Sequence, residues 1–220
     1  MTELAATIHR LQDRIRASGR EITLLAVTKT IPPERVDAAL AAGITVFGEN
    51  KVQEAKAKIP LVSSRAHWHF IGHLQTNKAR DAVELFELIH SVDSVKLAGE
   101  LDKWAAHAGK TQPILLEINV AGEAQKFGIK PEDLPATLAQ INQLSRLDVR
   151  GLMTVPPYCE EAEKVRPYFR RLRELRDAAG LCELSMGMSH DFEIAIEEGA
   201  TIVRVGTAIF GERKKHESTD

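Results

Sequence analysis

The sequence predicts an α/β protein, a (β/α)8 TIM barrel preceded by an N-terminal helix. Short apolar runs alternate with amphipathic helical patterns along the whole chain, which is typical of right-handed βαβ units and a parallel sheet. Eight such runs occur, the strand number of this barrel, although 220 residues is near its short end. An open doubly wound sheet is the alternative, and the absence of a G-x-G-x-x-G fingerprint after an early strand disfavours it.

The first 19 residues predict an amphipathic helix rather than a signal peptide. Leu4, Ile8, Leu11 and Ile15 recur at helical spacing, charged residues lie between them, and Gly19 ends the pattern. The predicted strands then follow at residues 22–27, 44–48, 67–72, 88–92, 113–119, 148–154, 181–187 and 201–206.

Helical patterns separate these strands. Residues 32–43 begin with two prolines, which suit a first helical turn, and stop at Gly43. Longer amphipathic patterns cover 131–144 and 160–180, the second closed by Gly180, and residues 191–200 repeat the order of helix and glycine. Because no linker or low-complexity stretch interrupts the chain, we expect one domain over residues 1–220.

Composition excludes several classes of function. A hydrophobic content of 44% and a charged content of 27% suit a globular protein with a sizeable core. The net charge of −2 lacks the basic excess of a nucleic-acid binder or of a protein held at an anionic membrane. No apolar run approaches the roughly 20 residues of a membrane span. Cys159 and Cys182 form no C-x-x-C pair, which favours a reducing, cytoplasmic setting.

Two loops at one end of the predicted barrel resemble a phosphate site. The C-terminal strand ends build the active sites of this fold, and the loops after strands seven and eight commonly hold a phosphate. Here those loops are "SMGMSHD", with Ser185, Gly187 and Ser189, and "VGTAIFGE", with Gly206 and Thr207. Glycine lets the backbone approach an anion, and the hydroxyls donate hydrogen bonds. The same residues are also common in ordinary loops, so that alternative stays open.

Lys29 follows the apolar strand at 22–27. It is either a solvated lysine at a strand end or an amine that condenses with an aldehyde. Facing a phosphate site, it would suit a phosphorylated aldehyde such as pyridoxal 5′-phosphate (PLP), or the substrate of a lysine-dependent aldolase. Arg204 interrupts the apolar run at 201–206. Three interpretations of Arg204 are open. It lies on the helix-facing side, or it pairs with a core carboxylate such as Glu117, or it faces the barrel mouth, where it can donate to the ring nitrogen of PLP.

Several motifs resemble the family of pyridoxal phosphate homeostasis proteins. They are "LLAVTKT", "FGENKVQEAKAK", "WHFIGHLQTNK", "GLMTVP" and "LSMGMSHDFEIAIEEGATIVRVGTAIFGER", which together span about residues 22–213. The resemblance implies a barrel of the alanine-racemase N-terminal domain type that holds PLP as a lysine aldimine. It implies Lys29 as the Schiff-base lysine and Arg204 as the partner of the ring nitrogen. The other implied contacts are Ser185, Gly206 and Thr207 at the phosphate, and Asn50 and Met188 in the pocket.

The expected function is PLP binding with a part in vitamin B6 homeostasis and delivery. We expect a non-catalytic monomer that hands PLP to apo-PLP enzymes, and we assign no catalytic residue. The alternative is a PLP-dependent amino-acid racemase, which needs a base on each face of the α-carbon. Tyr158 and Tyr168 are the two tyrosines of the chain, and Tyr168 lies within a helical pattern. A lysine-dependent aldolase is a third, weaker interpretation.

Three histidines, one cysteine and one lysine invite other interpretations. His67, His69 and His73 lie close in sequence, but no nearby carboxylate or cysteine completes a metal site, and we expect none. A cysteine nucleophile needs a nearby base, and no spacing in the sequence marks one for Cys159. We therefore interpret Cys159 as an ordinary thiol. Lys126 belongs to the loop "VAGEAQKFG" after the fifth strand, and we hypothesise that it influences PLP release.

Overall fold

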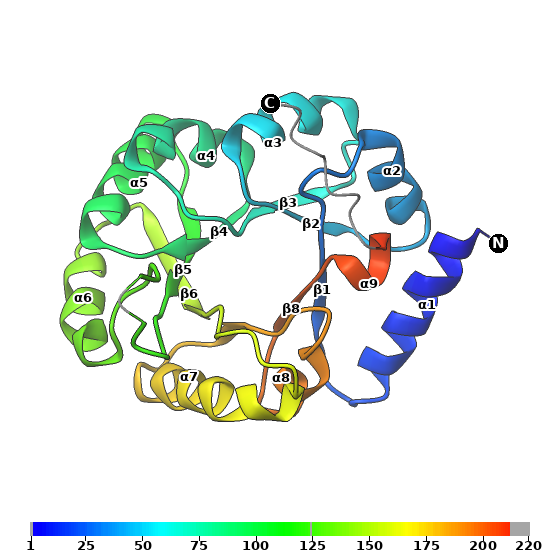
Figure 1. Cartoon of the computed structure of the whole chain (residues 1–220). Coiled ribbons are helices and arrows are strands. Elements are labelled where there is room, and N and C mark those ends of the chain that lie inside the picture. The colour runs from blue at the N-terminus through cyan, green and yellow to red at the C-terminus, as the bar shows by residue number, and fades with distance from the viewer. Residues whose placement is uncertain (1, 124, 212–220) are drawn as a thin grey trace, which may run out of the picture.

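Parallel strands close into a barrel in chain order from β1 to β8, and β1 also pairs with β8 (Figure 1). This computed structural model describes residues 2–123 and 125–211. The predicted barrel and its strand order are confirmed, with strand ends shifted by at most two residues. The strands are β1 (Thr23–Val27), β2 (Val46–Glu49), β3 (His67–Phe70), β4 (Leu88–Val92), β5 (Gln112–Glu117), β6 (Leu147–Met153), β7 (Glu183–Ser185) and β8 (Ile202–Val205).

Helices surround the barrel on the outside. Those predicted from the sequence form at α1, α2, α6, α7 and α8, whereas α3, α4 and α5 fill connections whose helices the sequence pattern did not delimit. No helix among the described residues is long and apolar enough to cross a membrane. The helices are α1 (Glu3–Arg16), α2 (Pro33–Ala41), α3 (Val52–Lys58), α4 (Ala79–Leu85), α5 (Val95–His107), α6 (Leu134–Ile141), α7 (Arg166–Ala178), α8 (Phe192–Glu197) and α9 (Thr207–Phe210), with short 3-10 turns at Ile59–Leu61, Thr76–Lys78, Pro131–Asp133 and Ala162–Val165.

Each strand is covered on both faces, which explains its nearly continuous apolar run. Alternation sends one set of side chains into the barrel and the other toward the helices. The interior cluster contains Leu25, Leu88, Leu115, Met153 and Ile202. The outer cluster, between sheet and helices, contains the alternate strand residues, such as Ala26, Phe47, Ile89, Leu116, Val203 and Val205.

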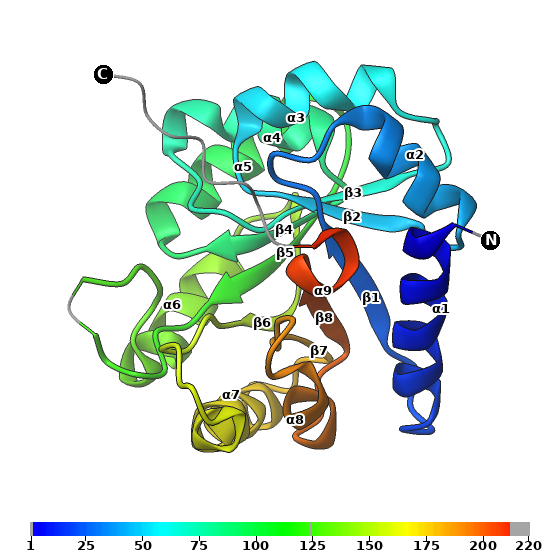
Figure 2. The same ribbon diagram turned by 45° about the vertical axis from the view of Figure 1, so that its right-hand side comes forward.

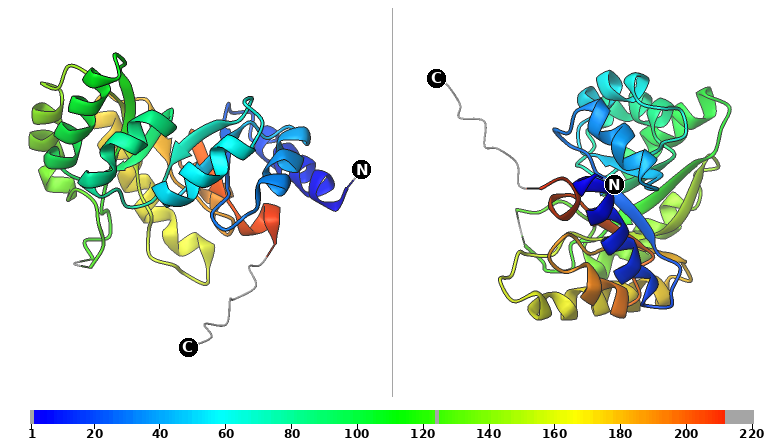
Figure 3. Two further views of the ribbon diagram at one scale, coloured as in Figure 1. Left: turned by 90° about the horizontal axis from the view of Figure 1, so that it is seen from above. Right: turned by 90° about the vertical axis from the view of Figure 1, so that its right-hand side faces the viewer.

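The N-terminal helix α1 fills a gap in the helical layer. The chain after β8 continues into the short α9, so the outer face near β1 and β8 needs cover from elsewhere. Gln12 of α1 donates to the carbonyl of Gly43 after α2 at 3.2 Å, and Arg14 pairs with Glu193 of α8 at 2.8 Å. Figures 2 and 3 show α1 on the outside of the barrel beside α2, and the right-hand view of Figure 3 places it between α2 and α8. Ile8, Leu11 and Ile15 of the predicted apolar stripe are buried there.

Candidate functional site

The residues predicted to bind a ligand gather around the C-terminal ends of the strands. Val27 packs against the interior cluster, and its Cα partner on β2 is Gly48. Lys29 and Asn50 each lie two residues beyond this pair, in the segments that follow the adjacent strands β1 and β2. Lys29 is half-buried in the turn that follows β1. The strand register thus brings Lys29 and Asn50 to the same end of the barrel.

A buried ionic cluster on the outer side of the sheet fixes the backbone around Lys29. The Lys58 ammonium donates to the Thr28 carbonyl at 2.7 Å and lies 2.6 Å from Oε1 of Glu49 and 2.8 Å from Oε1 of Glu54. The Thr28 hydroxyl also donates to Glu49 Oε1, at 2.6 Å. Burial raises the pKa of Glu49, and the hydrogen bond from Lys58 opposes that rise.

The same cluster reaches the residue after Lys29. Oε1 of Glu54 accepts the backbone N–H of Thr30 at 2.5 Å. Thr30 has φ of 65°, a left-handed conformation that a β-branched residue rarely adopts. Such a conformation persists where its surroundings hold it. Both peptide neighbours of Lys29 are therefore tied to one cluster, which restricts the path along which its side chain leaves the backbone.

Arg204 faces the barrel interior, as one of its three interpretations required. Its neighbours Val203 and Val205 point to the outer core, and its own side chain is 4% exposed. Nη1 donates to the Ser185 hydroxyl at 2.7 Å, and Nη2 donates to the Thr154 carbonyl at 2.8 Å. Because Thr154 directly follows β6, the guanidinium lies near the C-terminal strand ends.

The charges around Arg204 are partly compensated. Burial lowers the pKa of Arg204 to about 10, while Glu117 and Asp191 oppose that fall, so the guanidinium stays protonated at neutral pH. Burial, with the nearby charge of Asp93, raises the pKa of Glu117 to about 7, and Arg204 opposes that rise. Arg204 therefore acts as a fixed hydrogen-bond donor, and Glu117 is a nearby carboxyl group with a raised pKa.

The loops after β7 and β8 lie against each other, as predicted for a phosphate site. The Ser189 hydroxyl accepts the backbone N–H groups of Gly206 and Ala208, each at 3.2 Å. Gly187 has φ of 89°, and a Cβ there would lie 2.5 Å from the Cβ of Ala195, so only glycine fits this turn. Thr207, at the start of α9, is exposed. Ser189, Gly206 and Thr207 thus form one polar corner of the mouth.

Ser185 occupies a different place from the one expected of a phosphate contact. Its side chain is fully buried inside the barrel. Its hydroxyl is engaged by Arg204 at 2.7 Å and by Nδ1 of His90 at 2.8 Å. Ser189 rather than Ser185 therefore lies beside Gly206 in the polar corner of the mouth. The sequence placed Ser189 in one of the two predicted phosphate loops but gave no role to His90. A polar residue within an apolar run, as His90 is in "LIHSV", is the same kind of signal as Arg204 within residues 201–206.

The other two predicted pocket residues differ in how they are presented. Asn50 lines a cavity of about 540 Å³ beside the ends of β2 and β3. Among the described residues, its Oδ1 is buried with no hydrogen-bond partner. Met188 is half-buried, and its backbone N–H donates to Asp191 Oδ1 at 2.6 Å. Asn50 therefore offers an unused amide oxygen for a ligand, whereas Met188 shapes the loop.

The three histidines that lie close in sequence have different polar partners in the fold. His67 contacts Glu87 at 3.0 Å, His73 contacts Asp93 at 3.3 Å, and His69 turns inward to His90. In the part of the chain that the structure describes, no group of three His, Cys, Asp or Glu residues could hold a metal ion. Their closeness in sequence therefore does not bring the three histidines to one site.

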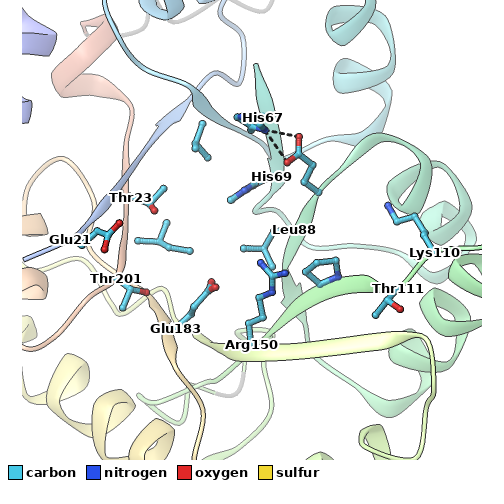
Figure 4. Close-up of a pocket in the computed structure, with 14 residues that line it drawn as sticks. Glu21, Thr23, His67, His69, Leu88, Lys110, Thr111, Arg150, Glu183 and Thr201 are labelled. Carbon is cyan, nitrogen blue, oxygen red and sulfur yellow. Dashed lines mark hydrogen bonds and ion pairs between the residues drawn. The ribbon is translucent and has the colours of Figure 1, made fainter. Parts of the chain in front are cut away.

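A second cavity opens at the opposite end of the barrel, and Figure 4 shows it. Its volume is about 670 Å³, and its lining comes from the beginnings of the strands, including Thr23, His69, Arg150 and Glu183. In Figure 4 the side chains of Arg150 and Glu183 extend toward the middle of this space. We call it the floor cavity. It contains none of the residues predicted to bind a ligand.

Comparison with known proteins defines the class first. Residues 2–214 match the family described as "Alanine racemase, N-terminal domain". The chain is also similar in fold to alanine racemase of Clostridium difficile, with a TM-score of 0.76 at 14% identity, covering 96% of this chain and 58% of that one. At that identity the likeness concerns the barrel alone.

Closer relatives define the family within this class. The chain is 47% identical to the pyridoxal phosphate homeostasis protein of Aquifex aeolicus, covering 96% of this chain and 97% of the relative. It is 45% identical to that of Pseudomonas aeruginosa, covering 97% of each. The structure of PipY of Synechococcus elongatus with PLP bound has a TM-score of 0.87 and 39% identity, covering 95% of this chain and all of that one. The chain belongs to the family of pyridoxal phosphate homeostasis proteins.

Proposed function

We propose that this protein binds PLP at the mouth of the barrel and takes part in intracellular PLP homeostasis. The observation that carries the proposal is the inward-facing Arg204, whose guanidinium is held by Ser185 and Thr154 near the strand ends. A guanidinium donates hydrogen bonds and accepts none, so it suits an unprotonated ring nitrogen. PLP would supply an aldehyde to which a lysine amine can bond covalently.

The residues around the mouth fit the remaining parts of PLP. We assign Lys29 to the aldehyde, because it stands at the mouth with both flanking peptides fixed. We assign the phosphate to the corner formed by Ser189, Gly206 and Thr207, where the Ser189 hydroxyl accepts two backbone N–H groups and keeps its own hydrogen to donate. Asn50, with its unused amide oxygen, is a further contact in the pocket.

We propose that the protein acts as a carrier rather than as an enzyme. A donor at the ring nitrogen keeps that nitrogen unprotonated, which weakens the ring as an electron sink and disfavours amino-acid chemistry. Racemisation would need a second base. Tyr158 is 77% exposed with its ring 5.8 Å from that of His190, and Tyr168 packs against the outer core. Racemase activity is the alternative, with Tyr158 as its candidate base.

We propose apo-PLP enzymes as the acceptors of the cofactor. We further propose that the protein works as a monomer in the cytoplasm. The two free cysteines, Cys159 and Cys182, support a reducing compartment. The relatives of Aquifex aeolicus and Pseudomonas aeruginosa are named for PLP homeostasis, which supports a role in holding and passing on the cofactor.

The visible absorption of the purified protein tests this function. We expect a yellow band after reconstitution with PLP, loss of the band on borohydride reduction, and a reduced adduct mapped to Lys29 by peptide mass. Lys29→Ala should abolish the adduct, whereas Lys78→Ala, which removes another lysine at the mouth, should leave it in place. A protein that is colourless after incubation with excess PLP and removal of the unbound cofactor would refute PLP binding. Amino-acid turnover above the Lys29→Ala background would favour the racemase.

A further inference from the structure

A continuous chain of polar side chains crosses the barrel interior from the floor cavity to Arg204. Nδ1 of His69 lies 3.0 Å from Nε2 of His90, and Nδ1 of His90 lies 2.8 Å from the Ser185 hydroxyl. The Ser185 hydroxyl accepts from Arg204 at 2.7 Å. These four residues come from β3, β4, β7 and β8, and we call them the polar column. Its lower end, His69, lines the floor cavity (Figure 4).

The column has one direction of donation that satisfies all its members. Arg204 can only donate, so Ser185 accepts from it and has its own hydroxyl hydrogen left to place. His90 Nδ1 accepts that hydrogen, which puts the ring proton of His90 on Nε2. His90 Nε2–H then donates to Nδ1 of His69, whose own proton lies on Nε2.

The opposite direction leaves a polar group unsatisfied. If His90 carried its proton on Nδ1, Ser185 would accept from both Arg204 and His90. Its hydroxyl hydrogen would then have no acceptor among the contacts that the described residues make, although the side chain is fully buried. A buried donor without an acceptor is rare because it loses its hydration without replacement. The direction from Arg204 toward His69 is therefore the favoured one.

Both histidines in this direction are neutral, and their surroundings agree with that. Burial lowers the pKa of His69 to about 4. Burial, with the charges of His69 and Arg204, lowers the pKa of His90 well below its ordinary value of 6.5. A neutral imidazole has one acceptor and one donor, which is what each place in the column requires.

We propose that His90 is a positioning residue for Arg204, acting through Ser185. By accepting the Ser185 hydroxyl hydrogen, His90 turns the serine lone pairs toward Nη1 of Arg204. Nη1 is thereby held by Ser185 while Nη2 is held by Thr154, so the guanidinium is fixed in its plane. The inference rests on the proposed function, because Arg204 is assigned there to the ring nitrogen of PLP. It adds that Arg204, the residue assigned to the PLP ring, is ordered from the barrel interior by His90, which does not touch the cofactor.

Two substitutions of His90 separate its two hydrogen bonds. In His90→Asn the side-chain amide branches at Cγ, so its oxygen takes the place of Nδ1 and accepts from Ser185. In His90→Gln the amide lies one carbon further out, near the place of Nε2, so contact with His69 is kept and the acceptor for Ser185 is lost. Ser185→Ala removes the link itself. His67→Asn is the matched control, because His67 lies on the same strand as His69 but contacts Glu87 outside the column.

The equilibrium dissociation constant of PLP is the first measurement. We expect His90→Gln and Ser185→Ala to raise Kd about tenfold or more, as for loss of a hydrogen bond to a charged group. His90→Asn and the control should stay within about threefold of the parent. The absorption band of bound PLP should shift in the two weakened variants only. Equal weakening by His90→Asn and His90→Gln would overturn the proposal, since packing would then matter rather than the acceptor. Parent-like binding in all variants would also overturn it.

The second measurement needs no PLP and decides the question if a variant fails to fold. Imidazole nitrogen-15 chemical shifts of the parent protein report the tautomers of His90 and His69. Protons on Nε2 of both rings would support the column. A proton on Nδ1 of His90 would overturn it, because His90 would then offer Ser185 no acceptor. If the parent binds no PLP at all, the proposed function fails, and these shifts still show whether His90 orders Ser185 and Arg204.

Discussion

Replacing Lys58 by methionine would test whether the ionic cluster beside Lys29 holds the mouth of the barrel. Lys58 is 6% exposed, and Glu49, its partner at 2.6 Å, is fully buried. Methionine fills similar space without the charge. Glu49 would keep the hydrogen bond from the Thr28 hydroxyl at 2.6 Å but lose its positive partner. A buried carboxylate in that position either remains charged and unpaired or takes up a proton.

Proton uptake limits the cost of the substitution. The ordinary pKa of the Glu49 carboxyl is 4.5, so keeping it protonated at pH 7 costs about 3 kcal/mol at roughly 1.4 kcal/mol per pH unit. Burial already raises this pKa in the parent protein, so part of the cost is present there. The lost bond from Lys58 to the Thr28 carbonyl adds about 1 kcal/mol. We therefore expect Lys58→Met to lower the free energy of unfolding by about 2 to 3 kcal/mol at pH 7.

The pH dependence identifies the mechanism. The raised pKa of folded Glu49 means that the folded state binds the proton more tightly than the unfolded state. The stability that Glu49 contributes by binding this proton is therefore fully present below pH 4.5 and is lost as pH rises through the folded pKa. The deficit of Lys58→Met should shrink to about 1 kcal/mol at pH 5. Guanidinium chloride unfolding at pH 5 and pH 7 measures both values.

A double variant supplies the control. In Lys58→Met with Glu49→Gln no buried charge remains, so we expect at least half of the stability lost at pH 7 to return, with a weak dependence on pH. A single-variant deficit that is equal at the two pH values would refute the role of the buried charge. A double variant less stable than Lys58→Met at pH 7 would refute it as well.

Further predictions concern Glu117, Gly187 with Gly180 as its control, and Lys126. Glu117→Gln should remove a loss of stability of about 2 to 3 kcal/mol that the parent shows between pH 4.5 and 7, because the folded pKa of about 7 favours the protonated carboxyl; urea unfolding across that range measures it. Gly187→Ala should cost about 2 to 4 kcal/mol, since a Cβ would lie 2.5 Å from that of Ala195 at φ of 89°. Gly180→Ala, at φ of 66° with open space, should cost about 1 kcal/mol; urea unfolding of both glycine variants measures the difference. Lys126→Ala, which breaks the 2.7 Å pair with Glu123, should slow PLP transfer to an apo-acceptor enzyme without changing the absorption band; unchanged transfer would end that hypothesis.

The sequence predicted those features that follow from local pattern and strand order. Eight apolar runs with helices between them specify a parallel barrel, and the barrel then brings every loop after a strand to one end. Strict alternation within β8 also limited Arg204 to one of two faces. Lys29, Asn50 and Gly206 could be placed near one another on these grounds, before any side-chain contact was known.

The contacts of the polar side chains could not be predicted in the same way. Whether Ser185 or Ser189 lies beside Gly206 depends on where β7 ends, and β7 is only three residues long. The contact of His90 with Ser185 joins residues 95 positions apart across the barrel, so it depends on the curvature and stagger of all the strands between them. Neither the burial of Lys58 nor its approach to Glu49 leaves a local signal, because a lysine near a helix end is ordinarily solvated.

Strand alternation also separates the two systems that act on the site. Glu49 follows Gly48 on β2 and so points outward to α3, where it meets Lys58. The polar column instead uses inward-facing residues, His69, His90 and Ser185. Among the contacts made by the described residues, the ionic cluster reaches the site through the peptides on either side of Lys29, and the column reaches it through Arg204. Lys58→Met should therefore slow covalent attachment of PLP while leaving its absorption band in place, and His90→Gln should shift the band while Lys29 remains reducible with borohydride. One substitution that changed both measurements equally would show that the two ends of the site are not independently ordered.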